Sequence, residues 1–145
     1  DTMGGYIAKK LVKKLIGMGK AILGARILVM GMTFKENVAD IRNSKVVDII
    51  NELKDFGVEV DVVDPYADPE EVKKMYGFRL IEKPLGNYDA VVVAVSHDAY
   101  QGLDEKYFKS LTCDKAVLVD VKGMYRDKIH ELKYWSLYEN ILPLS

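Results

Sequence analysis

The sequence lacks a second cysteine, has only two histidines among its 145 residues, and carries almost no net charge. Because a single cysteine cannot form an internal disulfide and is typical of a reducing compartment, we predict a cytoplasmic protein. A formal charge of −1 gives no reason to expect nucleic acid or an anionic membrane as a partner. His97 and His130 lie far apart and Cys113 has no metal-ligand spacing, so we predict no metal site.

Long hydrophobic runs are also missing. No apolar stretch is long enough to cross a bilayer, and the N-terminus lacks the apolar region and cleavage site of a signal peptide. The chain begins with Asp1 rather than Met, and a helical pattern starts almost at once. We therefore expect a chain cut from a longer protein, with a length that suits one domain.

Apolar patterns along the chain predict strands and helices in alternation. Residues Met3 to Met18 form an amphipathic helix whose apolar stripe must bury against this domain or against a partner. The other predicted elements are strand Ile27–Met30, helix Val46–Phe56 capped by Asn43 or Ser44, strand Val58–Val63, helix Asp68–Gly77, strand Phe78–Ile81, strand Ala90–Val95, helix Leu103–Leu111, strand Ala116–Val119 and helix Asp127–Leu132.

This alternation predicts an α/β fold, a Rossmann-like three-layer sandwich with a mostly parallel sheet. Ala90–Val95 is apolar on both faces and is predicted to be central. Right-handed crossovers bring the carboxyl ends of parallel strands to one edge, where ligands bind. Candidate ligand residues therefore lie in the loops after Met30, Asp64, Val95 and Asp120.

The run from Gly31 to Ser44 is the most informative segment, because a strand–turn–helix unit normally binds phosphate there. It has no glycine fingerprint and offers Lys35 and Arg42 instead, so side-chain cations are expected to hold the phosphate. Alternatively, both are surface cations and Arg42 pairs with Asp40. Phe34 favours a ligand, since an aromatic ring beside Lys35 is costly to expose and can pack on a sugar or base.

Other loops carry weaker signals. Asp64 is either an acid for ribose hydroxyls or a turn former. His97 is a phosphate ligand or acid–base group, or else it packs within the loop. Lys122, beside Gly123, is equally consistent with a ligand role and a surface role. Cys113 lies outside these loops and is interpreted as an ordinary thiol.

The run from Gly31 to Ser44 resembles the G-x-x-F-K-x-x-x-x-D-x-R-x-S signature of the UDP-glucose/GDP-mannose dehydrogenase family, in its C-terminal domain. The segments Val63–Pro65, Ala94–His97 and Val119–Gly123 are similar as well. The opening residues Asp1–Tyr6 resemble the end of the helix that joins the family's domains. The resemblance thus implies an end of an interdomain helix and linker over residues 1–24, and a nucleotide-sugar-binding domain over 25–145.

The resemblance implies an NAD-dependent enzyme that oxidises the C6 hydroxyl of a nucleotide sugar to a carboxylate. In the family, an N-terminal Rossmann domain holds NAD, a middle domain forms the homodimer, and a cysteine nucleophile lies outside the part that this chain resembles. No catalytic residue is therefore expected here, and the chain alone is expected to be inactive.

By position, the resemblance implies that Phe34, Lys35 and Lys122 contact the UDP-sugar and that Arg42 reaches the NAD phosphates. The residues from Lys35 to Ser44 are similar to those of the family branch that acts on UDP-N-acetylhexosamines. Enzymes of that branch make uronic acids for polysaccharide biosynthesis. Two alternatives remain at this point. One is a stand-alone nucleotide-binding or regulatory module without catalysis, and the other is an assembly domain that dimerises through its first helix.

Overall fold

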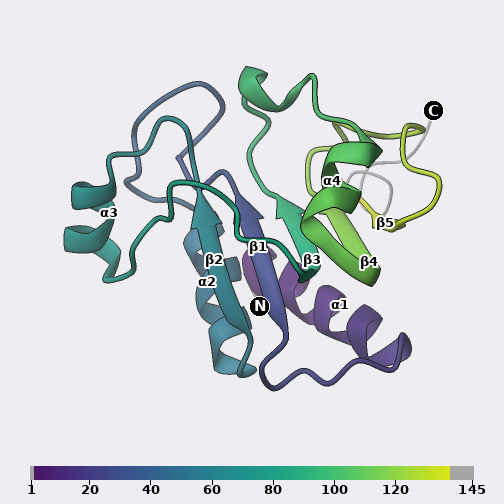
Figure 1. Cartoon of the computed structure of the whole chain (residues 1–145). Coiled ribbons are helices and arrows are strands. Elements are labelled where there is room, and N and C mark those ends of the chain that lie inside the picture. The colour runs from purple at the N-terminus through teal and green to yellow at the C-terminus, as the bar shows by residue number, and fades with distance from the viewer. Residues whose placement is uncertain (1, 138–145) are drawn as a thin grey trace.

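The computed structural model of the chain describes residues 2–137. These form a five-stranded parallel sheet with the strand order β2-β1-β3-β4-β5 (Figure 1). In chain order the elements are α1 (Met3–Gly17), β1 (Arg26–Met30), α2 (Val46–Asp55), β2 (Glu59–Val63), α3 (Pro69–Tyr76), β3 (Tyr88–Val93), the 3-10 helix η1 (Asp98–Tyr100), α4 (Glu105–Leu111), β4 (Thr112–Asp120) and β5 (Lys133–Trp135). The predicted α/β fold is confirmed, and β3 is its middle strand.

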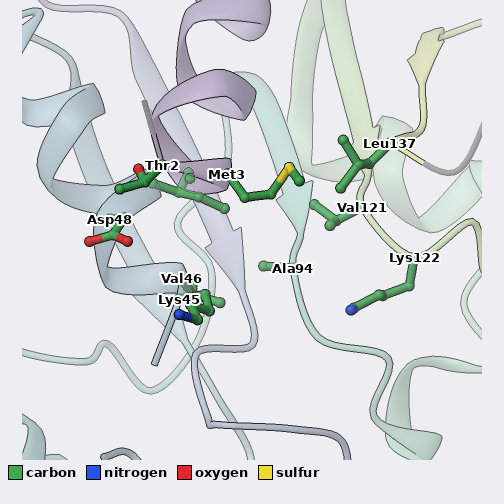
Figure 2. Close-up of a pocket in the computed structure, with 11 residues that line it drawn as sticks. Thr2, Met3, Lys45, Val46, Asp48, Ala94, Val121, Lys122 and Leu137 are labelled. Carbon is green, nitrogen blue, oxygen red and sulfur yellow. The ribbon is translucent and has the colours of Figure 1, made fainter. Parts of the chain in front are cut away.

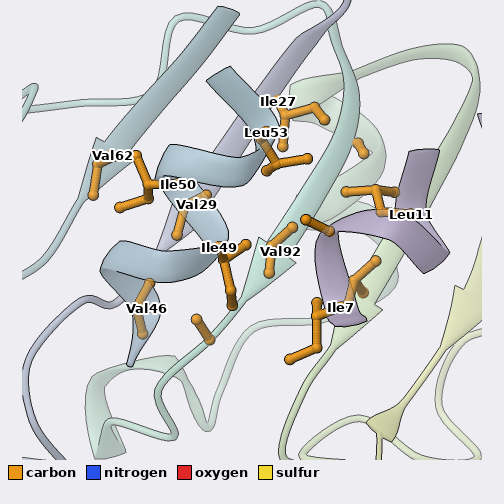
Figure 3. Packing of buried hydrophobic residues seen from close by; sticks show 14 of the residues in the cluster. Ile7, Leu11, Ile27, Val29, Val46, Ile49, Ile50, Leu53, Val62 and Val92 are labelled. Carbon is orange, nitrogen blue, oxygen red and sulfur yellow. The ribbon is translucent and has the colours of Figure 1, made fainter. Parts of the chain in front are cut away.

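Helices cover both faces of the sheet, because alternate strand residues point to opposite sides and both sides are apolar. On one face, α1 and α2 share a core with the strands (Figure 3). The strand residues of that core include Ile27, Val29, Ala90, Val92, Val117 and Val119. On the other face, Phe108 of α4 and Tyr125 share a core with Leu28, Val91 and Leu118. The sheet is thus the middle layer of a three-layer sandwich.

The apolar stripe of α1 lies inside the first of these cores. Ile7 is 2% exposed, and Leu11 and Leu15 are fully buried. The helix also approaches α2 so closely that a Cβ on Gly4 would meet the Cβ of Asp48 at 2.6 Å. The stripe therefore packs within this chain, and the assembly hypothesis, which needed it at a dimer contact, loses its support.

The start of α2 differs from the prediction. Its N-cap is Lys45, and no side chain caps the helix. Asn43 adopts a positive φ of 56°, and Ser44 is 8% exposed with its hydroxyl donating to the Met32 carbonyl at 2.6 Å. The predicted cap by Asn43 or Ser44 is therefore wrong, because Ser44 is used to anchor the preceding loop.

The segment Phe78–Ile81 is not a strand. Ile81 donates its N–H to the Val62 carbonyl of β2 at 2.9 Å, but the segment does not pair with β2 as a strand. The segment follows the left-handed Gly77 that ends α3. The prediction failed because three apolar residues among four do not distinguish a strand from a loop that packs on the core.

Residues Asp127–Leu132 do not form the predicted helix either. The carboxylate of Glu105 accepts the N–H groups of His130, Glu131 and Leu132, at 3.1 Å, 2.8 Å and 2.9 Å. These long-range bonds satisfy amides that a helix would otherwise use. The following residues form β5, which is too short for its pattern to be recognised in the sequence. No helix within residues 2–137 combines the length and apolar character needed to span a bilayer.

Candidate functional site

The carboxyl ends of β1 and β3 form the expected ligand edge of this sheet. The chain proceeds from β1 to β2 on one side, whereas β3 is followed by β4 on the other, so the strand order reverses between β1 and β3. Ligands of parallel α/β sheets bind at such a switch point. Two segments lie there: the loop of residues 31–45 between β1 and α2, and residues 94–97 after β3.

Side-chain hydrogen bonds fix the loop after β1. The Ser44 hydroxyl holds its end to the Met32 carbonyl, and the Thr33 hydroxyl donates to the Lys35 carbonyl at 2.9 Å. Thr33 itself is buried, whereas Phe34 is 52% exposed and Lys35 is exposed. The loop therefore has a fixed base and exposes an aromatic ring and an ammonium group at its surface.

A buried histidine–carboxylate pair joins three strand ends. His97, which follows β3, is fully buried and places Nε2 3.0 Å from Oδ2 of Asp64 at the end of β2. Its Nδ1 accepts the N–H of Asn37, from the loop after β1, at 3.0 Å. Because Nδ1 accepts, the neutral ring carries its proton on Nε2 and donates it to Asp64.

Asp64 is the centre of this network. Its Oδ2 also accepts the N–H of Met32 at 2.7 Å, and its Oδ1 accepts the N–H groups of Tyr66 and Ala67 at 2.7 Å and 3.0 Å. Burial alone would raise the pKa of Asp64, but the hydrogen bonds from His97 and from the three amides outweigh it and lower that pKa. The polar atoms needed for a ligand role are thus used to hold the loop, and we assign both residues to structure.

Three of the four residues predicted to bind ligands line a single pocket of about 120 Å³: Phe34, Lys35 and Lys122. Lys45 lines the same pocket and was missed in the sequence. The sequence feature that could have identified Lys45 is its position, directly after the signature run and at the start of a helix on the ligand edge. The pocket therefore gathers three ammonium groups and one aromatic ring, with Glu36 as the carboxylate on its wall.

A larger pocket of about 360 Å³ adjoins the first (Figure 2). The residues common to both pockets are Lys45, Val46, Ala94 and Lys122. In Figure 2 the two lysines lie on opposite sides of Ala94. Much of the remaining lining is apolar and includes Met3 and Leu137. The two pockets thus form a groove that is cationic where they meet.

Arg42 does not line this groove. It lines a separate pocket of about 460 Å³ with Asp40, Glu71 and Met75. Its Nε and Nη2 each donate to Asp40 at 3.0 Å, and its side chain is 75% exposed. Hydrogen bonds from the side chain and the backbone of Arg42 lower the pKa of Asp40 to about 2. The structure therefore shows the ion pair that the sequence offered as an alternative, on an exposed guanidinium.

The loop after β1 does not form a glycine cradle for the pyrophosphate of a dinucleotide. Gly31 serves close packing instead, since a Cβ there would meet the Cβ of Val95 at 2.8 Å. The residue that precedes α2 is Lys45, with a long side chain at the helix start. The residues of this loop thus do not fit NAD as a main binding site, and Arg42 remains an exposed cation near the end of the loop.

Cys113 lies at the opposite end of the sheet, near the start of β4. Its Sγ is 3.3 Å from Nζ of Lys20, which forms an ion pair with Asp89 at 2.8 Å. It contributes nothing to the groove. Within the part of the chain that the structure describes, no three His, Cys, Asp or Glu side chains are grouped to hold a metal ion.

Comparison with family models gives a match over residues 28–127 to the UDP-glucose/GDP-mannose dehydrogenase family, UDP binding domain. The chain is 38% identical over 123 residues to a UDP-N-acetyl-D-glucosamine 6-dehydrogenase from Salmonella typhi, covering 84% of this chain and 29% of that protein. It is 37% identical over 134 residues to the enzyme of that name from Pseudomonas aeruginosa, covering 92% of this chain and 32% of that protein. It is 42% identical over 125 residues to protein CapL from Staphylococcus aureus, covering 86% of this chain and 29% of that protein.

Solved structures agree on the fold. An NDP-N-acetyl-D-galactosaminuronic acid dehydrogenase from Methanosarcina mazei superimposes with a TM-score of 0.78 at 23% identity, over 92% of this chain and 29% of that one. A UDP-glucose dehydrogenase from Pyrobaculum islandicum superimposes with a TM-score of 0.65 at 27% identity, over 89% of this chain and 29% of that one. The chain thus spans 29% to 32% of the length of the curated relatives described above.

Proposed function

The chain belongs to the UDP-glucose/GDP-mannose dehydrogenase family, and we propose that it is the C-terminal, UDP-sugar-binding part of an NAD-dependent UDP-sugar 6-dehydrogenase. The proposed substrate is a UDP-N-acetylhexosamine, because relatives of 37% and 38% identity are named for one. The enzyme oxidises the C6 hydroxyl of that sugar, and the uronic acid so formed serves polysaccharide biosynthesis.

The groove at the switch point is the observation that carries this proposal. Lys35, Lys45 and Lys122 converge on its small pocket, and ammonium groups are good partners for a diphosphate because each brings a full charge and three donors. Phe34 lines the same pocket and is half-exposed, so its ring can pack on a base or sugar ring. A cationic pocket beside an exposed aromatic ring fits a nucleotide sugar better than it fits a neutral metabolite.

The chain's place in a longer enzyme is part of the proposal. The chain matches less than a third of the length of its relatives, so NAD and the catalytic groups are assigned to an N-terminal and a middle domain, the latter forming a homodimer. Residues 1–24 are proposed as the end of an interdomain helix and linker, and residues 25–145 as the nucleotide-sugar-binding domain. This chain then positions the substrate and supplies no catalytic group.

Replacing Lys35 with alanine should weaken UDP binding by about tenfold, because a charge-assisted contact to phosphate contributes roughly 1.5 kcal/mol. The measurement is a titration of the chain with UDP, followed by NMR chemical shifts so that millimolar affinities are captured. Lys13→Ala is the matched control, since that lysine is exposed on α1, away from the groove, and it should bind UDP as the wild type does. A Lys35→Ala chain that binds NAD in preference to UDP would point to a cofactor domain and contradict the proposal.

Arg42→Ala in the complete enzyme should raise KM for NAD by about tenfold and leave KM for the UDP-sugar within about twofold. The reason is that Arg42 lies outside the groove, on an exposed surface where it can meet a cofactor held by another domain. Steady-state kinetics with each substrate varied in turn separates the two constants. Equal effects on both would remove Arg42 from the proposed cofactor contact.

A further inference from the structure

Lys45 occupies the place where the two pockets of the groove meet. It is exposed, it precedes the first turn of α2, and it lines both pockets together with Lys122. Figure 2 shows the two lysines in the larger pocket. The two lysines come from different parts of the chain, one from the loop after β1 and one from the loop after β4. A ligand that extends from the small pocket into the large one must therefore pass between them.

The charges around this junction are not neutralised within residues 2–137. Cations elsewhere in the chain have carboxylate partners, such as Lys20 with Asp89 and Lys109 with Glu131. Lys35, Lys45 and Lys122 form no ion pair with any described residue. Two carboxylates line the pockets, Glu36 in the small one and Asp48 in the large one, so three ammonium groups face two carboxylates and the balance stays positive. The mutual repulsion of the lysines is relieved when an anion binds.

The start of α2 adds to this preference for an anion. No side-chain hydrogen bond caps the helix, and the helix dipole is positive at that end. Asp48 in the first turn offsets part of this charge and leaves the free amides available to an anion. Val46, the first residue of α2, lines both pockets beside Lys45. The helix start and the lysines therefore act on the same volume.

We propose that Lys45 binds the diphosphate of the UDP-sugar, together with Lys122, at the junction of the two pockets. This inference rests on the proposed function and adds a binding residue that lies outside the signature run. The diphosphate joins uridine to the sugar, and these two groups then occupy the small pocket and the large pocket, one in each. Lys45 acts through its charge, so an arginine at this position keeps the function and an alanine loses it.

The test is an NMR titration of the chain with uridine, UMP, UDP and inorganic pyrophosphate, carried out for the wild type, Lys45→Ala and Lys45→Arg. Lys54→Ala is the matched control, because it removes an exposed lysine from the other end of the same helix. We expect Lys45→Ala to weaken UDP and pyrophosphate by about tenfold, to weaken UMP less, and to leave uridine unchanged. Lys45→Arg and Lys54→Ala should bind as the wild type does.

The possible results separate the role of Lys45 from the proposed function of the chain. If the wild type binds UDP and Lys45→Ala binds it equally well, the role of Lys45 is overturned while the proposed function stands. If Lys45→Ala weakens uridine as much as UDP, the residue acts on the nucleoside or on the fold, and the diphosphate role is likewise overturned. If the wild type shows no shifts with millimolar UDP, the proposed function fails, and the inference fails with it.

Discussion

Replacing Asp64 with asparagine should lower the free energy of unfolding by about 3 kcal/mol. The carboxylate side chain is fully buried and accepts hydrogen bonds from the His97 ring and from the amides of Met32, Tyr66 and Ala67. An asparagine keeps one acceptor oxygen and turns an NH₂ group towards donors, so at least one buried N–H loses its partner. Urea unfolding at neutral pH measures the loss.

Asp55→Asn is the control, since Asp55 is an exposed carboxylate at the end of α2 and its replacement should change stability by less than about 0.5 kcal/mol. A loss at Asp64 no greater than at Asp55 would show that the network does not hold the fold. The loop after β1 should also loosen in Asp64→Asn, which amide hydrogen exchange of Met32 and Asn37 would detect.

The contribution of Asp64 should depend on pH in a defined direction. Its pKa in the folded state is lowered from the ordinary value of 3.8, by hydrogen bonds that outweigh burial. On acidification the unfolded chain therefore takes up this proton first, so the contribution is complete well above 3.8 and is lost as the pH falls through the lower, folded pKa. The stability difference between the wild type and Asp64→Asn should shrink between neutral pH and about pH 3. An unchanged difference over that interval would contradict the ionised state of Asp64.

Much of the fold is encoded in local patterns. Burial of the sheet on both faces leaves continuous apolar runs such as Ala90–Val95, and the capping pattern of Asp68 and Gly77 marks both ends of α3. Each of these signals comes from residues close together in sequence. Segments without them, such as Asp127–Leu132, take a shape set by Glu105, more than twenty residues earlier. Local propensity cannot reveal such a partner.

The same distinction applies to the site. Lys35 and Phe34 belong to a contiguous signature, so the sequence marks them, and the strand pattern places Lys122 at the same edge. The pairing of His97 with Asp64 joins residues 33 positions apart, and neither residue indicates the other in the sequence. Lys45 was missed for a different reason, since a lysine at a helix start is ordinary until a pocket is found against it. Convergence of side chains thus needs the tertiary structure, even where the loops are predicted correctly.

Gly31 shows how one position couples the fold to the site. It has a φ of +89°, and its N–H donates to the Val63 carbonyl of β2 at 2.9 Å. A Cβ at this place would lie 2.8 Å from the Cβ and 3.1 Å from the N of Val95. Val95 lines the small pocket next to Ala94. The first glycine of the signature therefore lets β1 and the segment after β3 approach closely enough to form the pocket wall.

Gly31→Ala should consequently cost about 4 kcal/mol of stability, of which roughly 1–2 come from the positive φ and the rest from the clash with Val95. Gly19→Ala separates the two terms, since Gly19 has a similar φ of +81° and open space around it, and it should cost only about 1–2 kcal/mol. Urea unfolding of both variants gives the difference. Because relief of the clash moves Val95 in the pocket wall, Gly31→Ala should also weaken UDP binding, whereas Gly19→Ala should not. Equal losses of stability in the two variants would mean that the chain relaxes around Val95 without strain, and the close approach would then not be what requires glycine at this position.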